Sequence, residues 1–388
     1  MWKTILRGLA GLVLIAVALG VWKREELVRL NAVNTLFSEE KIVHNFSHMA
    51  DLFHSKPIEI SGTPTPLLSS QDMTPPQGWE EWLNRRSVTA IVVLKDGDIH
   101  YESYYQGTGQ NDPRISWSVA KSYLSALFGV VLANGDIASL EDTVTTYAPS
   151  LKGSAYENAT ILNVLQMSSG VTFDEDYLDF WSDINKMGRV LALGGSMDGF
   201  AAGLTETFEA PGAQWKYVSI DTHILGMVLR GATGRDIPDL LGEYVLGPLG
   251  TYGAPHYVTD GDGVSFVLGG LNLTTRDYAR MGEMFRNDGA FQGRQIIPAD
   301  WAVQSTTPSA KTKPGNLKYG YQWWMPADAQ PGEFLARGIY GQYVYVNKEA
   351  GVVIAVNAAD RAFREEGANE DSITMFRKIA THLKERES

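Results

Sequence analysis

The chain has 388 residues, which is enough for one large domain or two medium ones. Its hydrophobic and charged fractions, 44% and 20%, are ordinary for a globular protein. A net charge of −12 argues against a nucleic-acid partner, which would need a basic face, and the absence of cysteine excludes disulfides, thiol nucleophiles and thiolate metal sites.

The N-terminal segment Gly8–Trp22 is apolar and uncharged, and it follows a basic start. It is either a secretory signal peptide, with a cleavage site at residues 16–18, or an uncleaved anchor. The bulky, charged sequence WKREELVRL that follows favours the anchor. We therefore expect residues 1–24 to be a single-pass membrane anchor with the remaining chain on the extracytoplasmic (periplasmic) side. Secretion after cleavage is the alternative.

Residues 25–76 are expected to connect this segment to the main domain at 77–388. His44, His48 and His54 have partly helical spacing, but they lack the Glu of His-Glu-x-x-His and no carboxylate cluster accompanies them. We therefore predict no metal site, and no cofactor motif is present.

The main domain begins and ends with strand patterns. Val88–Tyr105 alternates and has a turn at Asp96-Gly97, which predicts a hairpin. The middle of the chain is rich in helical patterns, and the segment Asp174–Gly199 is acidic, aromatic and irregular. This order predicts an α+β fold: an antiparallel sheet flanked by helices, with an inserted, mostly helical region at roughly 136–260. The other predicted helices are 160–168, 221–231, 237–246, 274–287 and 370–386, and the other strands are 341–347 and 351–357.

The helix predicted at Ile115–Gly135 begins with a Ser-x-x-Lys motif, Ser118 to Lys121. Residues three apart share a helix face, so the lysine amine is expected to approach the serine hydroxyl. A buried lysine near other positive charge loses its proton and can act as a base for a serine nucleophile. Taken alone, a helix cap and a solvated lysine explain the motif equally well, and a second match at Ser38–Lys41 lies in a charged stretch.

Several segments in order resemble the serine β-lactamase and penicillin-binding-protein superfamily, in its class C-like, esterase branch. Within that branch the chain resembles the 6-aminohexanoate-dimer hydrolases, the nylon-oligomer amidases. The resemblance implies a β-lactamase/transpeptidase-like fold and an acyl-enzyme mechanism. The segments are Ser118–Lys121, Leu165–Val171, Asp174–Met187, Lys216–Gly226 and Gly338–Val346.

The resemblance assigns further site residues. Tyr217, in Tyr217-Val218-Ser219, corresponds to a tyrosine that relays a proton to the leaving group, and its pKa is expected to be lowered by the lysine. Other Tyr-x-Ser or Tyr-x-Asn matches exist, but this one has the right context. The backbone N–H groups of Ser118 and Ile339 would form the oxyanion hole. Ser219 and Gly338 are expected to border the substrate.

One motif departs from the superfamily pattern. The strand that should carry Lys-Thr-Gly or His-x-Gly reads Ala336-Arg337-Gly338, so the cation that meets a substrate carboxylate is missing. Arg337 is expected to point to the opposite face of the strand. The departure weakens a β-lactamase or DD-peptidase assignment.

The acidic-aromatic segment is expected to bind substrate. By resemblance, Tyr177 contacts the substrate amide. Asp176 and its acidic neighbours would attract a free amino group, although a solvated acidic loop explains them equally well. Trp181 is expected to line an apolar cleft, with core packing as the alternative.

These observations predict a serine hydrolase that cleaves small-molecule amides or esters with Ser118, Lys121 and Tyr217. Two alternatives remain open at this stage. The first is a β-lactamase or DD-peptidase of the same superfamily. The second is a non-catalytic, membrane-tethered protein that binds the cell wall.

Overall fold

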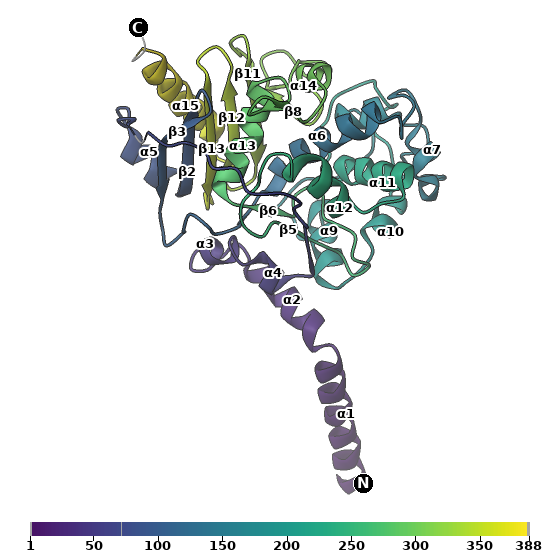
Figure 1. Ribbon diagram of the computed structural model, residues 1–388. Helices are drawn as coiled ribbons and strands as arrows, with labels where there is room; N and C mark the ends of the chain where they lie inside the picture. The colour runs from purple at the N-terminus through teal and green to yellow at the C-terminus, as the bar shows by residue number, and fades with distance from the viewer. Residues whose placement is uncertain (1, 71, 386–388) are drawn as a thin grey trace.

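The main sheet has seven antiparallel strands in the order β3-β2-β13-β12-β11-β10-β9, and it lies beside a helical region (Figure 1). This computed structural model describes residues 2–70 and 72–385. Strands from both ends of the main domain meet in the sheet, which confirms the predicted α+β class. The strands are β2 Val88–Lys95, β3 Asp98–Tyr104, β9 Lys318–Tyr319, β10 Trp324–Met325, β11 Glu333–Gly338, β12 Gln342–Asn347 and β13 Val352–Ala358.

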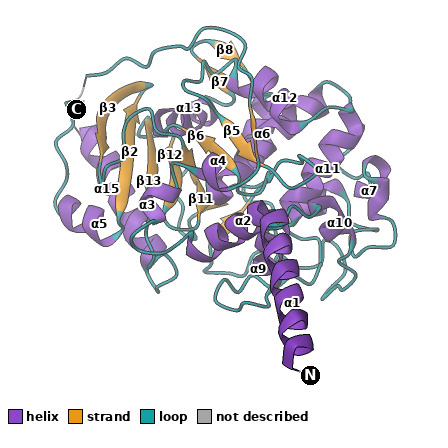
Figure 2. Ribbon diagram, turned by 90° about the horizontal axis from the view of Figure 1, so that it is seen from below, coloured by secondary structure: helices purple, strands orange, loops and turns teal. Residues whose placement is uncertain are grey.

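Helices cover the sheet and fill the region beside it (Figure 2). Five of the predicted helices appear, as α6, α8, α11, α13 and α15, although α8 is shorter than predicted, and the one predicted at 237–246 forms as α12 followed by a π-helical turn, η3. The helices are α5 Trp79–Arg85, α6 Ala120–Ala133, α7 Val144–Tyr147, η2 Pro149–Leu151, α8 Ile161–Leu165, α9 Asp183–Ala192, α10 Met197–Ala202, α11 Asp221–Thr233, α12 Ile237–Leu241, η3 Gly242–Leu246, α13 Thr275–Arg286, α14 Ala299–Ser305 and α15 Ala368–Glu385.

The predicted hairpin is confirmed as β2 and β3, joined at Asp96 and Gly97. Both turn residues have positive φ, 51° and 94°, as a two-residue type I′ turn requires. Alternate side chains of β2 enter two different cores: Val92 packs into the one that includes α13, and Val93 into the one that includes α5 and α15. Because both faces are covered, β2 is buried along its whole length.

Two helices, α9 and α10, occupy the segment that we expected to be irregular. Ser182 caps α9 by accepting the backbone N–H of Asn185. Ile184, Met187 and Leu191 fall three and four residues apart and are all buried. The acidic and aromatic residues before α9 obscure this short helical period in the sequence.

The residues that we expected to connect the N-terminal segment to the main domain pack against it. β1 (Ser55–Pro57) pairs with β5 (His256–Val258) in a four-stranded sheet of order β1-β5-β6-β4, in which β4 is Arg114–Ile115 and β6 is Leu271–Leu273. Leu36, Phe46 and Met49 are buried in the core that includes α6. This packing brings the N-terminal residues close to the candidate site. A separate two-stranded sheet joins β7 Ala290–Phe291 to β8 Arg294–Gln295.

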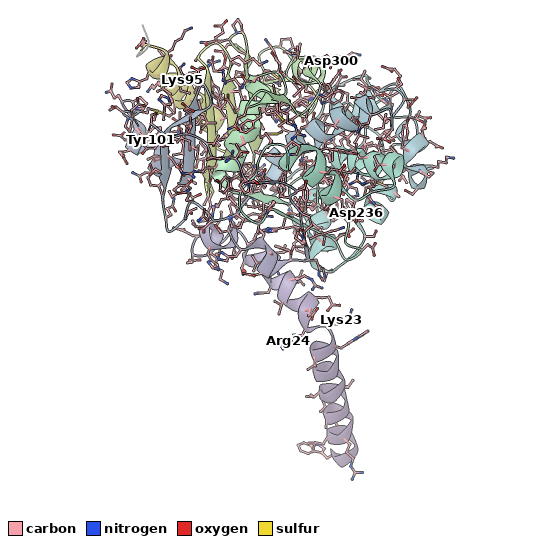
Figure 3. All side chains as sticks on the ribbon, viewed as in Figure 1. Lys23, Arg24, Lys95, Tyr101, Asp236 and Asp300 are labelled. Carbon is pink, nitrogen blue, oxygen red and sulfur yellow. The ribbon has the colours of Figure 1, made fainter. Side chains whose placement is uncertain are left out.

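The N-terminal helix α1 (Trp2–Trp22) extends away from the remaining chain, and Lys23 and Arg24 mark its junction with α2 (Arg24–Thr35) (Figure 3). Short helices α3 (Ile42–Asn45) and α4 (Met49–Leu52) follow. Over the described part of the chain, no helix is long and apolar enough to cross a membrane. The membrane anchor predicted at residues 1–24 is therefore not supported.

Helix α6 packs closely against Trp301 of α14 at Gly129. A Cβ added at Gly129 would lie 2.3 Å from the indole of Trp301. That indole stacks on Phe128, with ring centroids 5.9 Å apart, and its Nε1–H donates to the carbonyl of Ser125 at 2.8 Å. The close contact explains a glycine inside a helix, where glycine costs roughly 0.5–1 kcal/mol relative to alanine.

Gly129→Ala is expected to lower the free energy of unfolding by about 1–3 kcal/mol, because overpacking against Trp301 outweighs the gain in helix propensity. Urea unfolding curves measure the change. Gly188→Ala in α9 is the matched control, since nothing lies within 4 Å of an added Cβ there, and it should raise stability by up to about 1 kcal/mol. Equal effects at the two positions would contradict the close-packing explanation.

Candidate functional site

Ser118 and Lys121 meet at the start of α6, as the motif predicts. Ser118 lies in a short 3₁₀ turn, η1 (Trp117–Val119), and Lys121 lies in the first turn of α6. The Lys121 Nζ donates to the Ser118 Oγ at 3.2 Å and to the Leu268 carbonyl at 2.7 Å. Ser118 is half-buried, whereas Lys121 is 2% exposed. The pair has the contact that a serine nucleophile and its base require.

Burial lowers the pKa of Lys121 to about 7. The charges of Glu175 and Asp221 act in the opposite direction and raise the pKa. Our expectation that positive neighbours would depress the pKa is therefore wrong, since the cause is loss of hydration around the ammonium. A lysine with this pKa is about half neutral at pH 7 and can accept a proton.

Tyr217 lies beside the pair and stacks on Trp324, with ring centroids 5.4 Å apart. The Lys121 Nζ is 5.6 Å from the centroid of the Tyr217 ring. Burial and the charge of Glu175 raise the pKa of Tyr217 above its usual value, although the side chain of Ser118 lowers it. The predicted lowering is therefore wrong in sign. Tyr217 keeps its proton at neutral pH and is suited to donate it.

The end of β11 approaches the backbone of Ser118 closely. A Cβ added at Gly338 would lie 3.0 Å from the Ser118 nitrogen and 2.8 Å from the Ser116 carbonyl oxygen. Only glycine permits this approach. Ile339 follows directly and lines the same cavities as Ser118. This proximity supports the predicted pairing of the two backbone amides as an oxyanion hole, although their N–H directions remain a prediction.

An aromatic cluster holds both of these backbone segments. Trp117 and Tyr340, the neighbours of Ser118 and Ile339, have left-handed φ values of 42° and 59°. Such a conformation costs about 1–3 kcal/mol in a residue other than glycine and persists only where packing enforces it. Phe37 stacks on Tyr340 at 4.5 Å, and Phe46 packs edge-on against Trp117 at 5.5 Å. No local pattern around Phe37 or Phe46 indicates that these N-terminal phenylalanines reach the site.

Glu175 is a site residue that we did not single out from the sequence. Its carboxylate accepts hydrogen bonds from the backbone N–H and the hydroxyl of Ser219, the latter at 3.0 Å, and from the Tyr177 hydroxyl at 3.5 Å. Burial raises its pKa, while these donors and Lys121 lower it. Tyr177 and Ser219 therefore lie at the site, as predicted, and both are hydrogen-bonded to the half-buried carboxylate of Glu175.

Asp176 and Trp181 are not brought to the site. Asp176 is exposed and pairs with Arg364 at 3.2 Å. Trp181 is 70% exposed and packs on Phe180, with ring centroids 4.9 Å apart. Consecutive side chains of this loop point in different directions, so Glu175 faces inward and Asp176 faces solvent. The predictions that Asp176 and Trp181 line the substrate site are not supported.

Two cavities meet at Ser118. The first is apolar and has a volume of about 840 Å³, including the part open to solvent. The second, of about 810 Å³ on the same measure, contains Glu175, Tyr217 and Arg337. The Arg337 guanidinium lies 4.8 Å from the centroid of the Trp324 ring, and it forms no ion pair with any carboxylate of residues 2–70 or 72–385. Arg337 therefore reaches the cleft, contrary to our expectation that it would point away.

Comparison with known families agrees with this geometry. The sequence model of the beta-lactamase family matches residues 80–373, about three quarters of the chain. A 6-aminohexanoate-dimer hydrolase from Paenarthrobacter ureafaciens is 27% identical over 289 residues, which cover 71% of this chain and 73% of that protein.

Solved structures show the same fold. A structure designated a candidate 6-aminohexanoate-dimer hydrolase, from Bacillus anthracis, has a TM-score of 0.77 at 23% identity and covers 90% of this chain and 96% of its own. EstCE1, a hydrolase with promiscuous acyltransferase activity, has a TM-score of 0.58 at 14% identity, with coverages of 79% and 96%.

The reactivity of Ser118 should depend on pH through Lys121. Labelling of Ser118 by a fluorophosphonate probe should accelerate as pH rises through about 7, the pKa of Lys121, and then level off. Glu175→Gln removes a negative charge that raises this pKa, so the midpoint should move to lower pH. Labelling rates across a pH series measure both midpoints.

Asp176→Asn is the matched control, because it removes the adjacent carboxylate on the solvent side of the loop. Its midpoint should equal that of the unaltered protein. If Glu175→Gln left the midpoint of labelling unchanged, or moved it to higher pH, the electrostatic coupling of Glu175 to Lys121 would be contradicted.

Proposed function

The chain belongs to the beta-lactamase family of serine hydrolases, and from this premise we propose that it cleaves small amides or esters through an acyl-enzyme on Ser118. The observation that carries the proposal is the contact of 3.2 Å between Lys121 Nζ and Ser118 Oγ. Burial lowers the pKa of this lysine to about 7, so a substantial fraction is neutral near pH 7 and can accept a proton.

In the first step, neutral Lys121 accepts the Ser118 proton as Oγ attacks the substrate carbonyl carbon. The backbone N–H groups of Ser118 and Ile339 hold the negative oxygen of the tetrahedral intermediate. Tyr217 donates its proton to the leaving nitrogen or oxygen, and the Lys121 ammonium returns a proton to Tyr217. Because its pKa is raised, Tyr217 is protonated at neutral pH and has a proton to give, which the returning Lys121 proton replaces.

In the second step, water attacks the acyl carbon. Lys121, neutral again, accepts a proton from the water, and Ser118 Oγ regains one as the acid product leaves. The same residues serve both steps because each step forms a negative oxygen at the same place and moves a proton past the same lysine.

Amides or esters are favoured over β-lactams and cell-wall peptides by the residue at position 336. Ala336 is buried and supplies no cation at the position where the superfamily resemblance expects one, and the cation that does reach the cleft, Arg337, enters it from the next residue by passing over Trp324. The relative from Paenarthrobacter ureafaciens adds 6-aminohexanoate-dimer to the substrates that merit testing. Nitrocefin turnover comparable with ester turnover would favour the β-lactamase alternative instead.

Ser118→Ala should abolish hydrolysis of short p-nitrophenyl esters, because no other group can form the acyl-enzyme. Lys121→Ala and Tyr217→Phe should each lower kcat/KM by roughly 10²–10⁴-fold, the usual contribution of a positioned base or acid. Initial rates with p-nitrophenyl acetate measure these losses.

The second Ser-x-x-Lys match supplies matched controls. Ser38→Ala and Lys41→Ala change the same residue types outside the site, and both variants should keep full activity. Unchanged turnover in Ser118→Ala would overturn the proposed function. Absence of both turnover and fluorophosphonate labelling in the unaltered protein would favour a non-catalytic binding role.

A further inference from the structure

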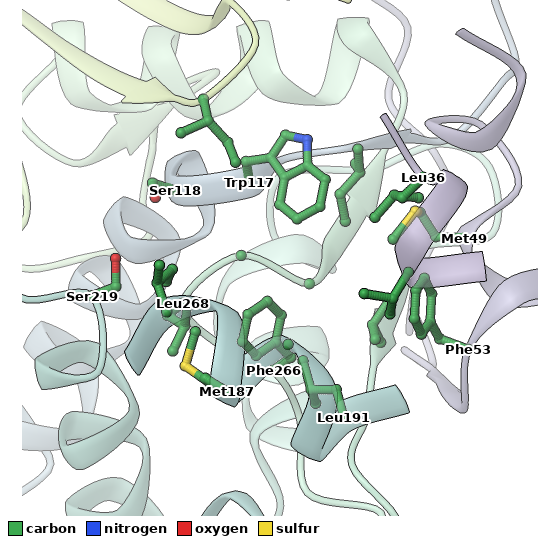
Figure 4. Close-up of a pocket in the computed structure, with 18 of the residues that line it drawn as sticks. Leu36, Met49, Phe53, Trp117, Ser118, Met187, Leu191, Ser219, Phe266 and Leu268 are labelled. Atoms are coloured by element: carbon green, nitrogen blue, oxygen red, sulfur yellow. The ribbon is translucent and has the colours of Figure 1, made fainter. Parts of the chain in front are cut away.

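The apolar cavity begins at Ser118 and runs beneath the N-terminal helices (Figure 4). Its volume is about 840 Å³, including the part open to solvent. None of the described residues that line it is charged. The side chains farther from Ser118 come from the N-terminal region, α9 and the loop before β6, and they include Leu36, Met49, Phe53, Met187, Leu191 and Phe266.

Asn185 and Ser219, two of the polar side chains in this cavity, are already paired, whereas the indole Nε1–H of Trp117 is buried without a partner. The Asn185 amide donates to the backbone carbonyls of Tyr177 and Asp179 at 3.1 and 2.7 Å. The Ser219 hydroxyl donates to Glu175. A ligand in the cavity therefore meets an uncharged surface, and a charged group placed there would lose its hydration without an oppositely charged partner among the lining residues.

The position of Tyr217 decides which part of a substrate enters. A carbonyl attacked by Ser118 has its acyl chain on one side and its leaving group on the other. The leaving group must face Tyr217, its proton donor, and Tyr217 lines the second cavity but not the apolar one. The apolar cavity is then on the acyl side.

We propose that the apolar cavity binds the acyl chain, and that the substrates are esters or amides of uncharged, linear acyl groups of medium length. This inference rests on the proposed function of Ser118. It also separates the chain from hydrolases of ω-amino acid oligomers, because a terminal ammonium would be buried without a carboxylate partner. The leaving group enters the polar cavity, where the Arg337 cation suits a small anionic or polar head.

The acyl preference is tested with p-nitrophenyl acetate, butyrate, hexanoate and octanoate. Each methylene moved from water into the cavity should raise kcat/KM by about threefold to fourfold until the cavity is filled. p-Nitrophenyl 6-aminohexanoate should be cleaved at least about tenfold less efficiently than the hexanoate, its uncharged counterpart. A flat chain-length profile, or equal cleavage of this pair, would overturn the proposal.

Gly188→Phe tests the location of the chain. Gly188 lines the cavity, and an added Cβ meets nothing within 4 Å, so a larger side chain at this position starts from open space. The ratio of octanoate to acetate kcat/KM should fall at least about tenfold. Lys186→Phe places the same ring on the exposed face of α9 and should leave that ratio unchanged. An unchanged ratio in Gly188→Phe, with a normal melting curve, would place the chain elsewhere.

A second measurement avoids substitutions altogether. Alkylboronic acids bind active serine hydroxyls covalently. Their inhibition constants should therefore decrease by about threefold to fourfold for each added methylene, as kcat/KM increases for the esters. Failure of the proposed function is distinguishable from failure of the acyl-cavity proposal. If the proposed function were wrong, no ester of any length would be cleaved, and the fluorophosphonate probe would not label Ser118. Cleavage without chain-length preference would leave the serine mechanism intact and overturn only the acyl cavity.

Discussion

The candidate site depends on the burial of one ammonium group. Lys121 could not act as a base in water, where its pKa would be far above neutral. The structure surrounds it with α6, the carbonyl of Leu268 and the ring of Tyr217, and it leaves 2% of the residue exposed. The negative charges of Glu175 and Asp221 stabilise the protonated form of Lys121, so they raise its pKa and limit the lowering caused by burial. The pKa near 7 is thus a balance between lost hydration and two nearby carboxylates.

A second constraint is the backbone around the expected oxyanion hole. Trp117 and Tyr340 both adopt left-handed conformations, and each is packed by a phenylalanine from the N-terminal region. Both phenylalanines, Phe37 and Phe46, lie outside the matched family segment at 80–373. The N-terminal residues therefore do not serve only as a connection between α1 and the main domain. They pack on the two backbone segments that bear Ser118 and Ile339, and they form one wall of the apolar cavity.

Much of the fold and the reactive pair could be predicted from the sequence because both depend on local patterns. The hairpin turn at Asp96-Gly97 and the Ser118 helix are set by residues a few positions apart. Glu175 could not be distinguished from Asp176, because the direction of each side chain depends on the loop that carries it. The contact of Phe37 with Tyr340 joins residues 303 positions apart in the sequence, and no local period reveals it.

The alternation of side chains along a strand led us to place Arg337 on the wrong face, and the position of Arg337 in β11 explains why. In a strand, neighbouring residues point to opposite faces, so a residue one before Gly338 should leave the cleft. Arg337 lies near the end of β11, and its long side chain instead passes over Trp324 of the adjacent strand and reaches the rim. A cation at the rim and an uncharged cavity behind Ser118 give the two sides of the scissile bond opposite chemical surroundings. The residues that create this difference lie mostly outside the Ser-x-x-Lys and Tyr-x-Ser motifs, so members of one family can share a mechanism and still select different substrates.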